Sequence, residues 1–408
     1  MTAATDDQAP ELEFDPYSQV FFDDPYELYR RMRDDAPVYR NDHYGFYALS
    51  RYEDVVTAHR DWRTFTSTHG ITIDVLTDPS SVGPAGNSEG APGQIIFMDP
   101  PDHDRMRNLV SRVFTPKAIA DLGPMIRRLI NHYLDRAIEA GTGSGTAGFD
   151  AVADFSAPFP VEVISTMLGI PEGDRQQIRH WTDTMLSREP GNPKPTDAGM
   201  EAAMNQGMYV YALAQEKRRS PGDDMISGLC EAGLTDEEVA GFSILLAAAG
   251  SETVTKMIGN GVVLFARNPE QWQLVRDDRD LLVPAMEEVL RYWAPSQYQG
   301  RWATEATTWH GTEIPAGSPV LLITGAANRD ERAYPDPDRF DVQRPLKLNV
   351  GFGHGIHTCL GAALARIEAR VAFDEIANRW SEFTVDESQC RRVHMSNVAG
   401  YSNVPVLV

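Results

Sequence analysis

The feature that most constrains the fold is a long, largely apolar helical segment in the middle of the chain. It begins at a capping box formed by Thr235 and Glu238, and acidic residues follow in its first turn. The helical pattern continues to Pro269, which gives about 33 residues and a length of about 50 Å. Residues 244–249, Ile-Leu-Leu-Ala-Ala-Ala, offer little polar surface, and such a helix is stable only when it is buried. We therefore expect the rest of the chain to fold around this helix.

The other elements divide into a helical majority and a strand-rich minority. Short strand patterns between turn residues mark 36–70, 300–325 and 394–408, and the last of these is expected to form a hairpin. Helical patterns dominate 97–295 and 359–380. We predict a mainly α protein with a smaller β-rich lobe, in one domain that spans 1–408. Segments rich in Gly, Pro and Ser are expected to be surface or binding loops: 78–93, 141–148 and 189–196.

Composition excludes several functional classes. The net charge is −22, which argues against a general nucleic-acid or anionic-membrane binder. Residues 1–16 are polar and acidic, and no run of about 18 apolar residues occurs, so neither a signal peptide nor a membrane anchor is expected. The cysteines are Cys230, Cys359 and Cys390, which favours a reducing cytoplasm over a disulfide framework.

One cysteine has an unusual setting. Residues 351–366 read Gly-Phe-Gly-His-Gly-Ile-His-Thr-Cys-Leu-Gly-Ala-Ala-Leu-Ala-Arg, and a strong helical pattern runs from Leu360 to Trp380. The glycines allow unusual backbone angles and a close approach to a flat ligand. Cys359 is then expected at a helix N-terminus, where the dipole and free amides stabilise a thiolate. A thiolate held in this way is suited to act as an axial ligand of iron.

This run resembles the haem-binding signature of cytochromes P450, Phe-x-x-Gly-x-x-x-Cys-x-Gly, at Phe352, Gly355, Cys359 and Gly361. A lone cysteine beside a Gly-rich turn is more often an ordinary buried side chain, but the whole run favours the signature. The resemblance covers the chain from about Asp24 onward and is to soluble, cytoplasmic bacterial members of the actinobacterial type. It implies the P450 prism fold and haem b, with Cys359 on the iron and Phe352 and Gly361 beside the cofactor.

Further residues match the family's other motifs. Glu288 and Arg291 share one helix face at i,i+3, and the resemblance implies a structural triad with Arg344. A carboxylate between two guanidinium groups satisfies charge and hydrogen bonds together. Four side chains are implied as donors to the haem propionates: His103, Arg107, Arg301 and His357.

The long helix contains Ala249-Gly250-Ser251-Glu252-Thr253, which resembles the family's oxygen-activation motif. An acid beside a threonine can relay protons to dioxygen, so Glu252 and Thr253 are the predicted catalytic residues. The alternative is that these side chains have no catalytic role and only line a buried helix. A buried Glu252 needs polar partners in either case.

The resemblance implies a monooxygenase that inserts one oxygen atom from O2 into a hydrophobic small molecule, such as a lipid, branched fatty acid, steroid or terpenoid. Because no flavin or iron–sulfur module is apparent, electrons are expected from a ferredoxin and its reductase. A basic docking patch would include Arg112, Lys117 and Lys347. The alternatives are a peroxide-driven haem enzyme and a non-catalytic haem-binding or sensor protein, and the acid–threonine pair argues against both. The substrate-pocket residues implied are Ile244, Ala248, Ala249, Gln297, Tyr298 and Val398.

Overall fold

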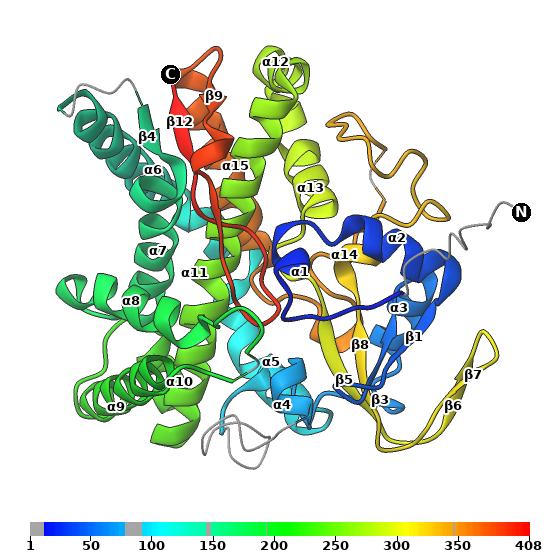
Figure 1. Cartoon of the computed structure of the whole chain (residues 1–408). Coiled ribbons are helices and arrows are strands. Elements are labelled where there is room, and N and C mark those ends of the chain that lie inside the picture. The colour runs from blue at the N-terminus through cyan, green and yellow to red at the C-terminus, as the bar shows by residue number, and fades with distance from the viewer. Residues whose placement is uncertain (1–11, 78–91, 144–147, 193, 346) are drawn as a thin grey trace, which may run out of the picture.

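The structure is a computed structural model that describes residues 12–77, 92–143, 148–192, 194–345 and 347–408. Helices predominate over a smaller sheet portion, as the sequence predicts (Figure 1). The α-helices of these residues are α1 (Gln19–Asp23), α2 (Tyr26–Asp35), α3 (Tyr52–Arg60), α4 (Ile73–Thr77), α5 (Asp102–Val110), α6 (Pro116–Gly143), α7 (Pro158–Leu168), α8 (Arg175–Leu186), α9 (Asp197–Arg219), α10 (Met225–Glu231), α11 (Asp236–Arg267), α12 (Pro269–Asp277), α13 (Leu282–Tyr292), α14 (Thr324–Ala327) and α15 (Ala362–Arg379).

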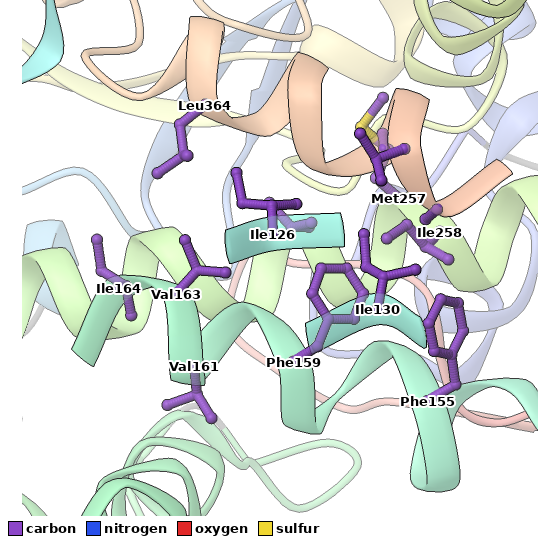
Figure 2. Packing of buried hydrophobic residues seen from close by; sticks show 14 of the residues in the cluster. Ile126, Ile130, Phe155, Phe159, Val161, Val163, Ile164, Met257, Ile258 and Leu364 are labelled. Atoms are coloured by element: carbon purple, nitrogen blue, oxygen red, sulfur yellow. The ribbon is translucent and has the colours of Figure 1, made fainter. Parts of the chain in front are cut away.

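Helix α11 crosses the middle of the molecule, with helices on one side and the main sheet toward the other (Figure 1). Its start is the predicted capping box of Thr235 and Glu238, and its C-cap is Asn268. Helices α7, α9 and α15 pack against this helix and supply apolar partners for its buried faces. Figure 2 shows part of this core, in which Phe159 of α7, Ile130 of α6 and Ile258 of α11 belong to one hydrophobic cluster. Burial along nearly its whole length therefore holds the helix in place.

The main sheet has the strand order β1-β2-β8-β5-β3. Strands β1 and β2 form the predicted hairpin, β8 runs parallel to β2, and β5 runs antiparallel to β8. This register sets Arg301 of β5 opposite Val320 of β8, which are both buried. The strands are β1 (Val38–Asn41), β2 (Phe46–Leu49), β3 (Phe65–Thr66), β4 (Gly148–Asp150), β5 (Gln299–Ala303), β6 (Thr307–Trp309), β7 (Thr312–Ile314), β8 (Pro319–Leu322), β9 (Thr384–Val385), β10 (Arg391–Arg392), β11 (Tyr401–Asn403) and β12 (Pro405–Leu407).

One strand prediction is wrong. The expected hairpin within 394–408 does not form, because β11 pairs with β10 while β12 lies between β4 and β9. The last strand thus pairs with a segment more than 250 residues earlier in the chain. Local turn residues predict a hairpin, but long-range pairing leaves no local signal. Of the predicted loops, 78–91 and 144–147 lie outside the described residues.

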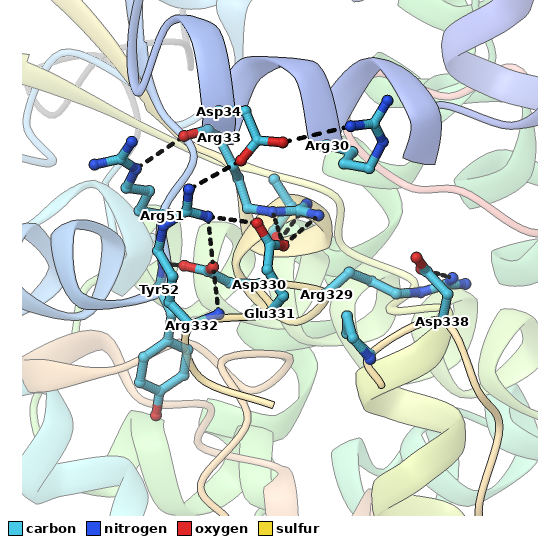
Figure 3. Close-up of polar contacts among 12 residues, drawn as sticks. Arg30, Arg33, Asp34, Arg51, Tyr52, Arg329, Asp330, Glu331, Arg332 and Asp338 are labelled. Atoms are coloured by element: carbon cyan, nitrogen blue, oxygen red, sulfur yellow. Dashed lines mark hydrogen bonds and ion pairs between the residues drawn. The ribbon is translucent and has the colours of Figure 1, made fainter. Parts of the chain in front are cut away.

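A network of charged side chains joins the sheet lobe to the segment that precedes the cysteine loop (Figure 3). Arg33 of α2 is almost fully buried and contacts both Glu331 and the backbone oxygen of Ala326. Asp330 accepts hydrogen bonds from the backbone N–H of Tyr52 and from Arg332. These contacts fix the path of the chain after α14. The segment that follows α14 is therefore held in one position beside α13.

The predicted triad of Glu288, Arg291 and Arg344 lies where this segment reaches α13. Arg291 donates to both carboxylate oxygens of Glu288 at 2.7 and 2.8 Å, and Arg344 donates to Glu288 at 3.2 Å. Arg291 and Arg344 also donate to four backbone carbonyls within residues 335–339. The side chain of Glu288 is only 3% exposed. A buried carboxylate therefore holds two cations, which in turn hold the irregular segment that leads to Cys359.

We expect Glu288→Ala to yield little folded protein, because Arg291 would be left buried without its anion, at a cost of roughly 3–5 kcal/mol. The measurement is soluble yield and the midpoint of chemical unfolding. Glu270→Gln removes an exposed carboxylate from α12 and should leave both unchanged. A Glu288→Ala protein as stable as the parent would contradict this structural role.

Candidate active site

The cysteine loop is shaped by backbone angles that favour glycine. Gly353 and Gly355 have φ of +68° and +70°, a region that L side chains rarely adopt. A Cβ on Gly355 would also lie 2.2 Å from the backbone oxygen of His59. The backbone N–H of Cys359 donates to the oxygen of Phe352 at 2.8 Å, which closes the loop. Arg366 of α15 lies over the Phe352 ring, 4.5 Å from its centroid, and covers one side of the loop.

The thiol of Cys359 lies just before α15, and its residue surface remains accessible. The surrounding protein atoms raise the pKa of this thiol above its ordinary value. The backbone amide of Gly361 and the guanidinium groups of Arg107 and Arg366 act in the opposite direction. The loop thus provides amide and cationic partners for a thiolate, while a coordinated metal ion would complete the deprotonation.

The four predicted propionate donors come together near this loop. The His103 and His357 rings are 4.8 Å apart, edge to face. Burial, followed by the charge of Arg301, lowers the pKa of His357 to about 2, and Arg107 acts in the same direction. Burial lowers the pKa of Arg301 to about 10. Arg301 is 4% exposed and its side chain donates to the backbone oxygen of Gly300, and no carboxylate of the described residues lies within ion-pair distance of it. A buried cation in this situation fits an anionic ligand group.

Sequence reasoning missed His59, at the end of α3. Its side chain is 3% exposed, and neither ring nitrogen has a hydrogen-bond partner. Burial and the nearby Arg301 hold the pKa of His59 well below its ordinary value, so the ring is neutral. The Nε2 of His103 also lacks a partner. Unpaired donors beside Arg301 match the acceptors that propionate groups would bring. No motif identifies His59, because only the fold places α3 against the cysteine loop.

Between its accessible ends, the long helix α11 is largely buried, and its middle carries an accessible strip. Ala249 is exposed, and Ile244, Ala248 and Thr253 are partly accessible. The Thr253 hydroxyl donates to the backbone oxygen of Ala249 at 2.8 Å. Glu252 points elsewhere: it is 3% exposed and pairs with Lys256 at 3.1 Å. The helix therefore presents an apolar, accessible strip that ends in a hydroxyl, with an acid directly behind it.

Two of the predicted pocket residues are corrected by the structure. Gln297 donates to the backbone oxygen of Ala294 and accepts a hydrogen bond from Tyr29. Both ends of its amide group are therefore already hydrogen-bonded to neighbouring protein groups. Tyr298 is fully buried in the aromatic cluster around Phe21, and its hydroxyl donates to the oxygen of Ser396. Sequence position placed both residues near the pocket, but side-chain direction depends on the packing of the N-terminal segments.

Three segments around the proposed pocket are tied together by a buried ion pair. Arg188, just after α8, contacts Asp74 of α4 at 2.9 Å, and their side chains are 9% and 2% exposed. Ser396 of the C-terminal segment donates to the same carboxylate at 3.3 Å. Val398, which remains partly accessible, follows in that segment and bridges to Ser296. This buried ion pair thus ties α4, the segment after α8 and the C-terminal segment to one another.

A thiol at a helix start near a buried arginine that has no ion-pair partner among the described residues fits a haem-thiolate protein. Among the described residues, no three His, Cys, Asp or Glu side chains gather as ligands of a bare metal ion. A family model for cytochrome P450 matches residues 84–399. The chain belongs to the cytochrome P450 family, its cofactor is haem b, and it is a monooxygenase.

The comparisons add specific relatives. The chain is 39% identical to a putative cytochrome P450 123 of Mycobacterium tuberculosis, over 98% of each chain. It is 37% identical to the erythromycin C-12 hydroxylase of Saccharopolyspora erythraea, over 92% of each. A solved structure of CYP109E1 from Bacillus megaterium in complex with testosterone superimposes with a TM-score of 0.83 at 32% identity, over 94% of this chain and 97% of that one. In the part of this chain that the structure describes, no helix is long and apolar enough to cross a bilayer.

We expect Cys359→Ala to lose thiolate-ligated haem, because no other thiol lies at the cofactor loop. Cys230 and Cys390 donate to backbone carbonyls in other parts of the fold. Cys230→Ala and Cys390→Ala are therefore matched controls that should keep the cofactor. The readout is haem content together with the carbon-monoxide difference spectrum of the reduced protein. A parent-like spectrum in Cys359→Ala would rule out Cys359 as the ligand.

Proposed function

We propose that this monooxygenase hydroxylates a hydrophobic molecule of the lipid or steroid type, with electrons from a ferredoxin and its reductase. The observation that carries the proposal is the apolar strip of α11, formed by Ile244, Ala248 and Ala249 and ending at Thr253. An apolar wall beside one hydroxyl suits a substrate that is held by surface burial rather than by charge pairing. The similar structure of CYP109E1, which was solved in complex with testosterone, supports the steroid part of this class.

Haem b would be held by Cys359 on the iron and by Arg301, His103, His357 and Arg107 at the propionates. Phe352 and Gly361 would shape the loop beneath it. When bound, haem supplies the redox chemistry that splits O2 and oxidises the substrate. The chain supplies orientation, exclusion of water and protons.

The acid and the threonine have different tasks in this proposal. Thr253 lies on the accessible strip, where its hydroxyl oxygen can accept a hydrogen bond from a water molecule while it donates to Ala249. Glu252 lies behind the strip, in the core, where its carboxylate would accept a proton and pass it on to that water. In this proposal Glu252 supplies the proton, and Thr253 positions the water molecule that receives it.

Electron supply gives a direct test of the proposed partner. With NAD(P)H alone the purified protein should be inactive, and a ferredoxin with its reductase should restore product formation from testosterone or a long-chain fatty acid. Of the three cations suggested for docking, Lys117 is exposed, whereas Lys347 donates to the oxygen of Ala333. The side chain of Arg112 lies outside the described residues. Turnover without any added protein would contradict the proposed partner.

Thr253→Ala should bind haem and substrate like the parent, because its hydroxyl bonds only within its own helix. It should still consume NAD(P)H but form less product and more hydrogen peroxide, since proton positioning of this kind contributes about 100- to 10,000-fold. Ser251→Ala is the matched control, because its buried hydroxyl bonds Ala247 in the same manner on another face. If Thr253→Ala couples electrons to product as well as the parent does, the role of Thr253 is wrong.

A further inference from the structure

Behind the acid of α11 lies a second carboxyl group that no family motif contains. Asp183 belongs to α8, which packs against α11, and its carboxyl group lies within hydrogen-bonding reach of the Glu252 carboxyl group. The two oxygens of Asp183 have different surroundings. Oδ1 is buried, and Oδ2 receives a hydrogen bond from Arg179 at 3.3 Å. The side chain as a whole is 37% exposed, so one carboxyl group connects accessible surface with the core.

Glu252 is the buried member of this pair. Its side chain is 4% exposed, and the ammonium group of Lys256, one helical turn later, lies 3.1 Å from Oε2. The stem of Lys256 packs against Gly400, where an added Cβ would lie 2.6 Å from the Lys256 Cβ. Lys256 is therefore held in place, and its charge stays beside Glu252.

The charges decide which carboxyl group carries a proton. Burial alone would raise the pKa of Glu252, but Lys256 and the hydrogen bond from Asp183 outweigh it and hold that pKa below its ordinary value. Desolvation, followed by the hydrogen bond and charge of Glu252, raises the pKa of Asp183 to about 8. Arg179 from α8 and Lys256 from α11 oppose this rise without cancelling it. At neutral pH the pair thus holds one proton, which resides on Asp183.

We propose that Asp183 is the residue that loads Glu252 with protons from the accessible side of α8. The proposal deepens the proposed function, since it rests on the role of Glu252 as the acid that supplies the active centre. Asp183 acts through Glu252 and is therefore a positioning residue for the proton, with no contact to substrate or cofactor required.

The step balances as a simple transfer of one proton. The O–H bond of Asp183 breaks as an O–H bond to the Glu252 carboxylate forms, and Asp183 is left as a carboxylate. Asp183 then takes up a proton from water at its accessible side, while Glu252 passes its own proton to the active centre. Lys256 keeps Glu252 anionic between transfers, so that it is ready to accept again.

The pH dependence follows from the direction of the shift. Below about pH 8, Asp183 carries the proton that the transfer needs. As the pH rises through this value, Asp183 loses that proton and the supply to Glu252 falls. Product formation should therefore decline on the alkaline side with a midpoint near 8.

The first test needs no turnover. Infrared spectra of the holoprotein are recorded between pH 6.5 and 9.5, and the protonated-carboxyl band that disappears over this range is assigned. It should be present in the parent and absent from Asp183→Asn. Burial also raises the pKa of Glu368, so Glu368→Gln is the matched control for a second buried carboxyl group and should keep the titrating band of Asp183. Glu201→Gln, which removes an exposed carboxylate from α9, should keep the titrating band. A titrating band that persists in Asp183→Asn overturns the proposal.

The second test uses turnover with ferredoxin and reductase. Asp183→Asn keeps the size of the side chain and a donor for Glu252, yet it cannot give up a proton. It should bind haem and substrate normally, form product about 100-fold more slowly, and lose the alkaline decline. Asp183→Glu should restore both rate and decline. If Glu252→Gln is slow while Asp183→Asn matches the parent, this inference fails and the proposed function stands. If Glu252→Gln also matches the parent, the proton role of Glu252 fails and the inference falls with it.

Discussion

Burial of α11 is the constraint on which the rest of the structure depends. A helix of 32 residues with few polar side chains must be covered on nearly every face. Helices α7, α9 and α15 provide much of that cover, and α15 is the helix that begins after Cys359. The same packing that hides α11 therefore brings the thiol to its side. The one strip that stays accessible, around Ala249 and Thr253, lies where the helix has its smallest side chains.

A second constraint is that the cysteine loop cannot hold its own shape. Its glycines adopt left-handed angles that give no stabilising side-chain contacts, so neighbouring segments must fix it. The carboxylate of Glu288 does this at a distance, through Arg291 and Arg344, which bind the carbonyls of residues 335–339. The charged network of Figure 3 continues the support to α2. Stability and function are thus linked, since the ion pairs that hold the fold also hold the ligand loop.

Charge is distributed unevenly around the centre. Near the cysteine loop, Arg301 is a buried cation that pairs with no carboxylate in the part of the chain that the structure describes, and the imidazole of His357 is kept neutral. Behind α11, Glu252 and Asp183 form a carboxyl pair with Lys256 and Arg179 around it. The cationic group suits the anionic edge of a cofactor, and the carboxyl pair suits the storage of a proton. Burying either set of charged groups alone costs free energy. Pairing offsets this cost, with the anionic cofactor for Arg301 and with Lys256 and Arg179 for the carboxyl pair.

The sequence by itself determined the long helix, its capping box, the glycine loop with Cys359 and the pairing of Glu288 with Arg291. These features depend on local spacing, which is visible in one dimension. Lys256 could also have been found, since it lies one helical turn after Glu252. Only the tertiary structure decided that β12 pairs with β4, that His59 lies beside Arg301, and that Asp183 meets Glu252. It also decided that the side chains of Gln297 and Tyr298 pack away from the predicted substrate pocket. These contacts join segments tens to hundreds of residues apart, and their partners follow from how helices and strands pack rather than from any periodicity along the chain.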